Sequence, residues 1–288
     1  MEDPCDLLGR VLAFADTREQ IVAVTQTGSR ARSYGGDAFS DLDVELIGPG
    51  TAELVGNDEW PETIADVLVS LHLANQGPDD PDWPTCLVVF AGGRKVDFTL
   101  AGTARIEAMK HEGLDTLYQR GYLVHRDKTG ITNGLAAATM APPDKPAPTA
   151  GEFEANQREF WFEATQVPIY LARGDLWPAA SRQSDMRTLL LTMLEWNTVT
   201  RCQGTIDTWY HGHHLEEWLP EHHHTRIAAT YAHYEAADAL RALHATIELY
   251  SDVVAETAKL VSLPVLNLQA KVLRHINAVI SRDNTVHD

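Results

Sequence analysis

Acidic side chains alternate with apolar ones along one short segment of the chain. Residues Asp41–Ile47, DLDVELI, have the two-residue period of a β-strand, which places Asp41, Asp43 and Glu45 on one face and the apolar residues on the other. Neighbouring carboxylates repel one another unless a cation lies between them, and Mg²⁺ prefers oxygen ligands. The spacing therefore predicts that Asp41 and Asp43 bind Mg²⁺. The alternative is an acidic strand face in contact with solvent.

A later pair of strands supplies another carboxylate. Leu87–Phe90 and Lys95–Leu100 have the composition of strands, and the intervening AGGR predicts a hairpin turn. Asp97 falls on the face opposite to the apolar residues of its strand, although aspartate disfavours strands. If this strand lies beside Asp41–Ile47, Asp97 joins the other two acids in a triad that is costly without a metal. The alternative is an exposed aspartate on a hairpin.

A glycine–serine pair follows a predicted buried strand, Ile21–Thr25. Gly28 permits a tight turn and a close approach of the backbone. Backbone N–H groups and the Ser29 hydroxyl at the start of a helix can bind an anion such as phosphate, with Arg30 adjacent. The sequence G-x-x-x-x-G-K-[ST] of a Walker loop does not occur. We therefore expect Gly28, Ser29 and Arg30 to bind phosphate groups, although Arg30 could also be an ordinary surface charge.

The elements that position these residues fall in the first half of the chain. Beside the strands, helical patterns cover Asp6–Asp16, Pro61–Leu73 and Arg105–Arg120, so we predict a mixed β-sheet with helices. The segment Ala141–Gly151, APPDKPAPTAG, contains four prolines and predicts a linker. We place a first domain at residues 1–145 and a second at 146–288.

The second half has the composition of a helical bundle. Apolar residues recur at helical spacing in four segments, within which Pro168 should kink or break the first: Glu152–Arg173, Ala179–Cys202, His223–Thr246 and Ile247–Val261. The predicted fold class is therefore α+β, with a mixed-sheet domain followed by an α-helical bundle.

Composition excludes several classes of protein. The 23 basic and 41 acidic residues give a net charge of −18, which argues against a general nucleic-acid or membrane-surface binder and favours a cationic partner. The 3 cysteines are widely separated and do not form a disulfide framework. No apolar run approaches the length of a membrane span, and the N-terminus is acidic rather than basic. We expect a cytoplasmic protein, and a monomer.

The order of these motifs resembles a known family. The residues GSR at 28–30, DLD at 41–43 and VDFT at 96–99 resemble the aminoglycoside 6-adenylyltransferase (streptomycin adenylyltransferase) family of the DNA polymerase β-type nucleotidyltransferases. In the second half, EFW at 159–161, YLARGDLW at 170–177 and RTLLLTMLEW at 187–196 are similar in order and spacing to the helical domain of that family.

The resemblance implies a reaction and a role for each acid. Asp41 and Asp43 would hold Mg²⁺ against the phosphates of ATP, and Asp97 would complete the metal site or act as general base. A hydroxyl of an aminoglycoside, such as streptomycin, would attack the α-phosphorus and release pyrophosphate. Ser29 and Arg30 would contact the β- and γ-phosphates.

The acceptor would bind through acidic and aromatic residues of the helical domain. The candidates are Glu159, Trp161, Tyr170 and Asp175, which could pair with or stack on guanidinium and ammonium groups. For Trp161 the alternative is core packing, and for Glu159 and Asp175 a solvated helix face. One alternative function is transfer to another antibiotic or to a protein hydroxyl. Another is a non-catalytic metal-binding protein.

A cluster of histidines is the last unusual feature. Six histidines, His211, His213, His214, His222, His223 and His224, lie within fourteen residues. Neutral imidazoles could bind zinc or nickel. Because no H-E-x-x-H motif occurs and Trp209–Pro220 resembles a loop, we favour an exposed, pH-sensitive segment over a specific metal site.

Overall fold

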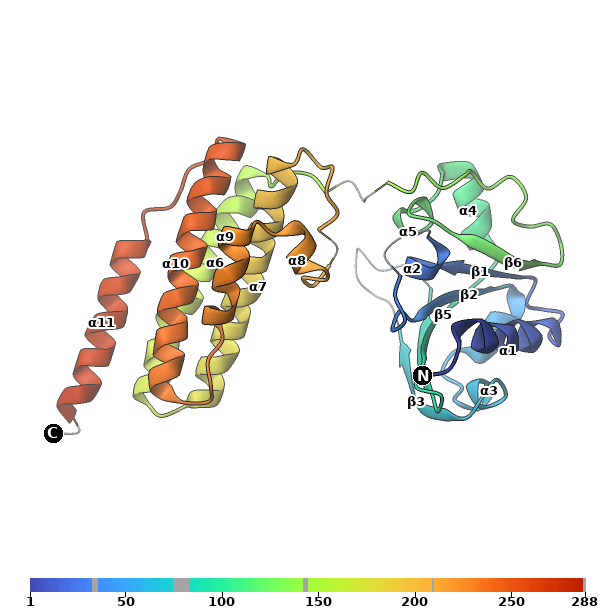
Figure 1. The fold of residues 1–288 in the computed structure, drawn as a ribbon, viewed down its shortest axis with the longest axis horizontal. Coiled ribbons are helices and arrows are strands. Elements are labelled where there is room, and N and C mark those ends of the chain that lie inside the picture. The colour runs from blue at the N-terminus through green and yellow to red at the C-terminus, as the bar shows by residue number, and fades with distance from the viewer. Residues whose placement is uncertain (33–35, 75–82, 142–144, 209, 287–288) are drawn as a thin grey trace. The chain divides into compact units, whose positions relative to one another are not determined.

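Two groups of secondary-structure elements follow one another along the chain (Figure 1). The computed structural model describes residues 1–32, 36–74, 83–141, 145–208 and 210–286. The chain divides into two units, residues 1–143 and 144–288, whereas the sequence placed the boundary after residue 145. The first unit combines a mixed sheet with helices and the second is helical, which confirms the predicted α+β class.

The first unit is built on a six-stranded sheet of order β3-β4-β5-β2-β1-β6. Neighbouring strands are antiparallel except β2 and β5, which are parallel. The predicted hairpin is observed as β4 and β5. The strands are β1 (Ala23–Thr27), β2 (Leu42–Ile47), β3 (Val67–Leu73), β4 (Thr85–Phe90), β5 (Lys95–Ala101) and β6 (Leu123–Asp127).

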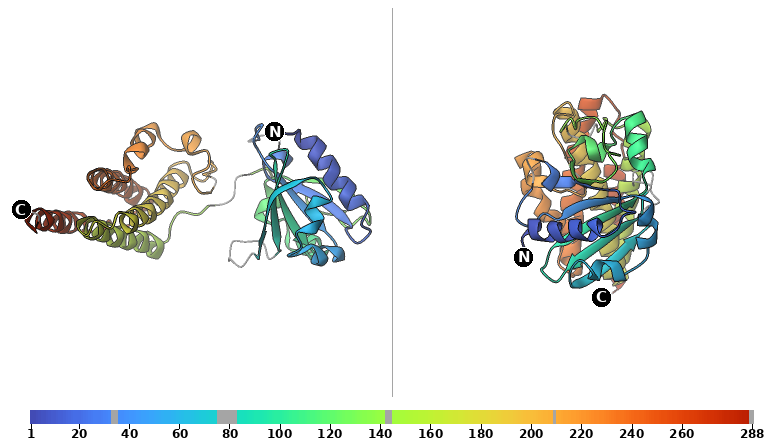
Figure 2. Two further views of the ribbon diagram at one scale, coloured as in Figure 1. Left: turned by 90° about the horizontal axis from the view of Figure 1, so that it is seen from below. Right: turned by 90° about the vertical axis from the view of Figure 1, so that its right-hand side faces the viewer.

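Helices cover both faces of this sheet, because its central strands carry apolar side chains on each side. On one face, Leu42, Val44 and Leu46 pack against α1, which Figure 2 shows lying along the sheet, and against Trp60 of α3. On the other face, a smaller cluster joins β1, β2 and β5 to α4 and α5. The helices are α1 (Pro4–Asp16), α2 (Gly28–Ala31), the 3₁₀ helix η1 (Pro49–Leu54), α3 (Glu59–Glu62), α4 (Ala104–Glu112) and α5 (Thr116–Gln119).

Two predicted helices of the first unit were wrong. The segment Pro61–Leu73 ends a short helix and then forms strand β3, whose VLVSLHL sequence is rich in residues that favour strands. The segment Arg105–Arg120 is interrupted at Gly113, where φ is +97° and helix α4 ends. A second helix, α5, begins at Thr116. The Asp115 carboxylate caps it by accepting a hydrogen bond from the backbone N–H of Tyr118.

The second unit packs long helices side by side around a core of its own (Figure 1). The stacked rings of Phe160 and Tyr250, with centroids 3.5 Å apart, lie in this core together with Trp161. Helix α6 begins with a capping box in which Thr149 and Glu152 bond reciprocally. The elements are α6 (Ala150–Ala172), α7 (Leu176–Arg201), α8 (Leu215–Trp218), α9 (Glu221–Ile227), the 3₁₀ helix η2 (Ala228–Thr230), α10 (Ala236–Val261) and α11 (Gln269–Val286).

Several boundaries in this unit differ from the prediction. Helix α6 continues through Pro168, which lies near its C-terminal end. The predicted helices His223–Thr246 and Ile247–Val261 are instead the short α9 and a continuous α10, because an extended backbone at Glu235 separates them. Helix α11 has no counterpart in the prediction. Of the predicted loop Trp209–Pro220, Trp209 lies outside the described residues, and α8 forms within the remainder.

Two other predicted segments are only partly described. Residues 33–35 of the segment between the glycine–serine pair and the first acids, and residues 142–144 of the predicted linker, lie outside the described residues. Among the helices that the structure describes, none is both long and apolar enough to cross a membrane.

Candidate active site

The pairing of three central strands brings the predicted acids together. Across the parallel pair β2 and β5, Asp43 lies opposite Asp97, and on the other side Asp43 lies opposite Thr27 at the end of β1. Asp41 directly precedes β2. The side chains of Asp41 and Asp97 are 34% and 25% exposed, so the group lies at the surface of the unit while remaining partly shielded from water.

Lys95 joins this carboxylate group and was not singled out from the sequence. Its ammonium Nζ lies 3.0 Å from Asp41 Oδ2 and 2.9 Å from Asp97 Oδ2. Burial alone would lower the pKa of Lys95, but its hydrogen bonds to Asp97 and Asp41 raise it above the ordinary value, so the group stays charged. The signal was present, because Lys95 and Asp97 are two residues apart on one strand and therefore share a face.

Burial and mutual repulsion disturb the ionisation of these acids. Burial, and then the charges of Asp41 and Asp97, raise the pKa of Asp43 to about 7. Burial also raises the pKa of Asp97, although the hydrogen bond from Lys95 opposes the change. Asp97 Oδ1 is buried and has no hydrogen-bond partner among the described residues. Such an arrangement is expected of a site that binds a cation.

Gly28 lies against the carboxylate of Asp43. Its φ is +69°, and a Cβ atom at this position would lie 1.8 Å from Asp43 Oδ2. Any other residue would therefore displace Asp43 or the turn. Ser29 follows in the four-residue helix α2, which begins directly where β1 ends. The turn at Gly28 thus packs against the carboxylate of Asp43.

Two arginines fix the loop that precedes Asp41. Arg30 donates from Nε to the carbonyl of Ser40 at 2.9 Å, and from a second nitrogen to the carbonyl of Asp37 at 2.9 Å. The buried Arg94 donates to the same Ser40 carbonyl at 2.8 Å. Arg30, predicted to contact phosphate, is therefore engaged with this loop. Arg94 was predicted only as part of a hairpin turn.

Glu45 shares the strand face of the acids but has a different environment. It is 1% exposed, and its two carboxylate oxygens each accept a hydrogen bond of 2.8 Å from Arg105 of α4. Tyr118 of α5 donates to the same carboxylate at 2.8 Å and lies 2.6 Å from the hydroxyl of Thr25. This buried network joins α4 and α5 to strand β2, which also carries Asp43.

The residues present fit a bound magnesium ion. Asp41, Asp43 and Asp97 offer only oxygen ligands, which Mg²⁺ prefers. The unpaired Asp97 Oδ1 and the repulsion that raises the pKa of Asp43 would both be relieved by a cation. In the structure the Lys95 ammonium supplies part of that positive charge.

Comparison with known families decides the class of the protein. The family model described as streptomycin adenylyltransferase matches residues 1–279. The chain belongs to this family. Membership of the streptomycin adenylyltransferase family confirms the predicted resemblance, identifies a nucleotidyltransferase and supports aminoglycoside adenylyltransferase activity. It favours an enzyme over the alternative of a non-catalytic metal-binding protein.

Individual relatives carry matching descriptions. The chain is similar to the aminoglycoside 6-adenylyltransferase of Bacillus subtilis (strain 168), with 25% identity over 275 residues that cover 89% of this chain and 91% of the relative. A crystal structure of an aminoglycoside 6-adenyltransferase from Bacillus subtilis aligns with 97% of this chain and 99% of that chain, at 18% identity and a TM-score of 0.47.

In this streptomycin adenylyltransferase family member, the four predicted acceptor residues have different environments. Glu159 lies exposed on α6, whereas Trp161 is 5% exposed and packs edge-on against Phe160 in the helical core. Tyr170 is partly buried on the last turns of α6, and Asp175 is exposed at the start of α7. The burial of Trp161 favours the core-packing alternative for that residue.

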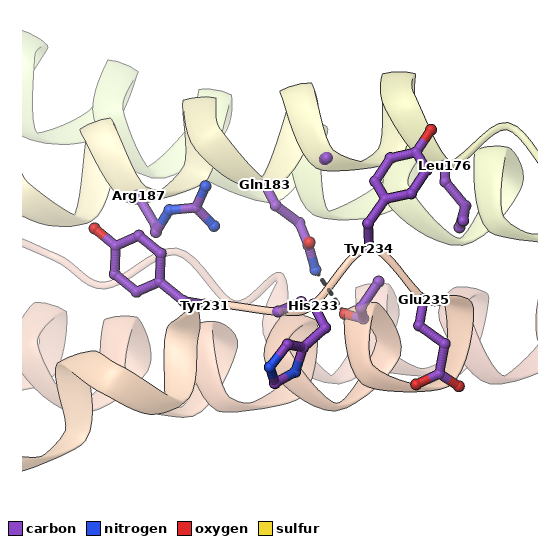
Figure 3. Close-up of a pocket in the computed structure, with 10 residues that line it drawn as sticks. Leu176, Gln183, Arg187, Tyr231, His233, Tyr234 and Glu235 are labelled. Atoms are coloured by element: carbon purple, nitrogen blue, oxygen red, sulfur yellow. Dashed lines mark hydrogen bonds between the residues drawn. The ribbon is translucent and has the colours of Figure 1, made fainter.

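A pocket of about 120 Å³ lies in the helical unit of this adenylyltransferase family member, between α7 and the segment that precedes α10 (Figure 3). The Arg187 guanidinium stands 4.6 Å from the centre of the Tyr231 ring, and burial lowers the pKa of Arg187. Gln183 donates to the carbonyl of Ala239 at 2.6 Å, and both residues line the pocket. The lining includes Leu176, the neighbour of Asp175, but none of the four predicted acceptor residues.

Proposed function

We propose that this chain transfers AMP from ATP to a hydroxyl group of an aminoglycoside, with streptomycin as the first candidate, and releases pyrophosphate. The observation that carries the proposal is the juxtaposition of Asp43 and Asp97 across β2 and β5, with Asp41 beside them and Gly28 packed against Asp43. Membership of the streptomycin adenylyltransferase family supports the same reaction.

Asp41 and Asp43 would hold Mg²⁺, and Asp97 would complete the site or act as general base. When bound, the ion neutralises charge on the ATP phosphates and so lowers the barrier to attack at phosphorus. The proposal needs the ion because the chain has a net charge of −18 and its cations near the acids are already engaged. Arg30 and Arg94 bond backbone carbonyls, and Lys95 bonds Asp41 and Asp97.

Asp97 is our candidate for the general base. The acceptor oxygen forms a bond to the α-phosphorus, the bond from that phosphorus to the β-phosphate bridge breaks, and pyrophosphate leaves. The hydroxyl proton passes to the carboxylate of Asp97, whose Oδ1 has no partner among the described residues. Burial raises the pKa of Asp97, which makes it a stronger base than a solvated aspartate.

Lys95 would keep the acids in position before substrates bind. Its ammonium bridges Asp41 and Asp97 and offsets part of their repulsion. Ser29, at the turn beside Asp43, remains our candidate for a phosphate contact. For the cationic acceptor, Glu159, Tyr170 and Asp175 remain candidates because they are exposed or partly exposed.

The test is an assay of pyrophosphate release with streptomycin, ATP and Mg²⁺. We expect release that depends on all three, and a loss of about 10²- to 10⁴-fold in Asp97→Asn if that residue is the base. The matched control is Asp16→Asn, which removes an exposed acid at the end of α1 and should leave the rate unchanged. Absent release would refute streptomycin as the acceptor, and release unaltered in Asp97→Asn would refute Asp97 as the base.

The choice of acceptor needs a separate experiment. A panel of aminoglycosides and protein substrates is incubated with ATP labelled in the α-phosphate. Label transferred to an aminoglycoside other than streptomycin would keep the chemistry and change the specificity. Label transferred only to protein would establish the alternative acceptor.

A further inference from the structure

The most distinctive group of side chains outside the triad joins helices α9 and α10. His222 and His223 lie on α9 and Glu256 on α10, and one ligand atom from each lies within 4.8 Å of the others. His223 Nε2 is 2.9 Å from Glu256 Oε2, and His222 Nε2 is 3.7 Å from Glu256 Oε1. The centres of the two imidazole rings are 4.0 Å apart.

These separations bring one ligand atom of each residue within reach of a single metal ion. In a tetrahedral zinc site with bonds of about 2.0–2.1 Å, two ligand atoms lie about 3.3–3.4 Å apart. The observed 2.9 and 3.7 Å run to different oxygens of Glu256, and the shorter contact is a hydrogen bond, so the side chains must rearrange for one carboxylate oxygen and both imidazoles to share an ion. Sequence spacing could not reveal the group, because Glu256 lies more than thirty residues from the histidines.

The surroundings suit a cation that is held on one side and open on the other. His223 is 1% exposed, while the side chains of His222 and Glu256 are 65% and 42% exposed. The nearby Arg226 is paired with Asp252 at 2.7 Å, although its charge still acts on His223. The Nδ1 atom of His223 is buried without a partner in the described structure, which leaves Glu256 to orient the ring.

The ligand types select the ion. Two imidazoles and one carboxylate are the protein ligands of several three-ligand zinc sites, in which a fourth position is left to water. Imidazole suits zinc and neighbouring transition metals, whereas an all-carboxylate group suits magnesium. The histidine-containing group would therefore bind zinc, and the three aspartates would bind magnesium.

We propose that His222, His223 and Glu256 bind one Zn²⁺ ion, which fastens α9 to α10. Helix α9 has only seven residues, and helices of that length are marginal without tertiary support. The Arg226–Asp252 pair is a partly exposed link between the same two helices. A metal bridge beside it would hold the histidine segment in place by a much stronger contact.

The experiment is a zinc titration of the full chain, stripped of metal and kept in millimolar Mg²⁺ so that the aspartates are occupied. A chromogenic zinc indicator competes for the ion. We expect one Zn²⁺ per chain, with affinity lowered at least tenfold in His222→Asn and in Glu256→Gln. His222 is largely exposed, so its replacement should leave the far-UV circular dichroism unchanged.

Two controls separate this site from others. His213→Asn removes an exposed histidine that lies outside the group, and Asp43→Asn alters the triad, so both should retain the zinc affinity. Substoichiometric binding, or equal affinity in His222→Asn and the unaltered chain, would overturn the proposal. So would a loss of zinc binding in Asp43→Asn, because that result would assign the ion to the triad. The titration does not depend on AMP transfer and remains informative if the proposed function fails.

Discussion

Asp43 is the residue whose chemistry depends most on its neighbours. Burial, followed by the charges of Asp41 and Asp97, raises its pKa to about 7 from the ordinary aspartate value of 3.8. The folded, metal-free protein therefore binds a proton that the unfolded chain releases at lower pH. The free energy of unfolding must then fall as the pH rises through this window, with the loss complete above about pH 7.

Replacing Asp43 by asparagine should remove the loss of stability that comes from ionising Asp43. We expect Asp43→Asn to match the unaltered chain near pH 4 and to exceed its stability by about 2–4 kcal/mol at pH 8, in the presence of a chelator. Urea unfolding at several pH values measures the difference. Asp16→Asn, an exposed acid, should show no such trend, and a constant difference across the pH range would contradict the assignment of the raised pKa.

Gly28 should be intolerant of even a single methyl group. In Gly28→Ala the new Cβ would lie 1.8 Å from Asp43 Oδ2, and the backbone would retain a positive φ. We expect AMP transfer to fall by about 100-fold, since displacements near 1 Å have such effects. Gly9→Ala on α1 is the matched control, because nothing lies within 4 Å of the position that its Cβ would take. Equal rates of AMP transfer in the two variants would show that Gly28 is not required for the position of Asp43.

At the scale of elements, the Glu45 network determines how α4 and α5 meet the sheet. In Glu45→Gln, Arg105 keeps only Asp115 as an ionic partner at 2.9 Å, and the buried guanidinium loses compensation. We expect a loss of about 3 kcal/mol in the free energy of unfolding, measured with urea. Glu53→Gln, on the exposed side of η1, should change it by less than about 0.5 kcal/mol. A similar small change in both variants would contradict the role of the network.

Local periodicity was sufficient to predict the strands that carry the acids. The alternation around Asp41 and Asp43 and the hairpin around Asp97 depend only on neighbouring residues, so both could be found in the sequence. The parallel pairing of β2 with β5 is a contact between distant segments, and the prediction had to assume it. Arg94 and Arg30 donate hydrogen bonds to a backbone carbonyl, and such contacts cannot be predicted from residue types.

Helix boundaries were less predictable for a related reason. Gly113 ends α4, where its φ is positive. The Pro168 position is tolerated within α6, and Glu235 marks a break that composition does not reveal. At Pro168 the packing of α6 in the helical core outweighed the local preference, whereas Gly113 ends its helix by a local effect.

At the scale of the whole molecule, each cluster of described buried residues comes from one unit alone. We therefore expect two calorimetric transitions. A non-hydrolysable ATP analogue with Mg²⁺ should raise the transition of the first unit by a few degrees, because a ligand at 100 times its Kd contributes about 2.7 kcal/mol. Zn²⁺ should raise the other transition. One transition moved equally by both ligands would contradict this independence.

The contact between Gly28 and Asp43 also bears on how members of this family are recognised in genome surveys. A homologous chain can keep all three aspartates and still lack the space that the second one occupies. If such chains were judged by their three aspartates alone, inactive chains would be counted as active enzymes. A glycine at the position of Gly28 reports whether the carboxylate can be accommodated, so it adds information that the three acids do not contain.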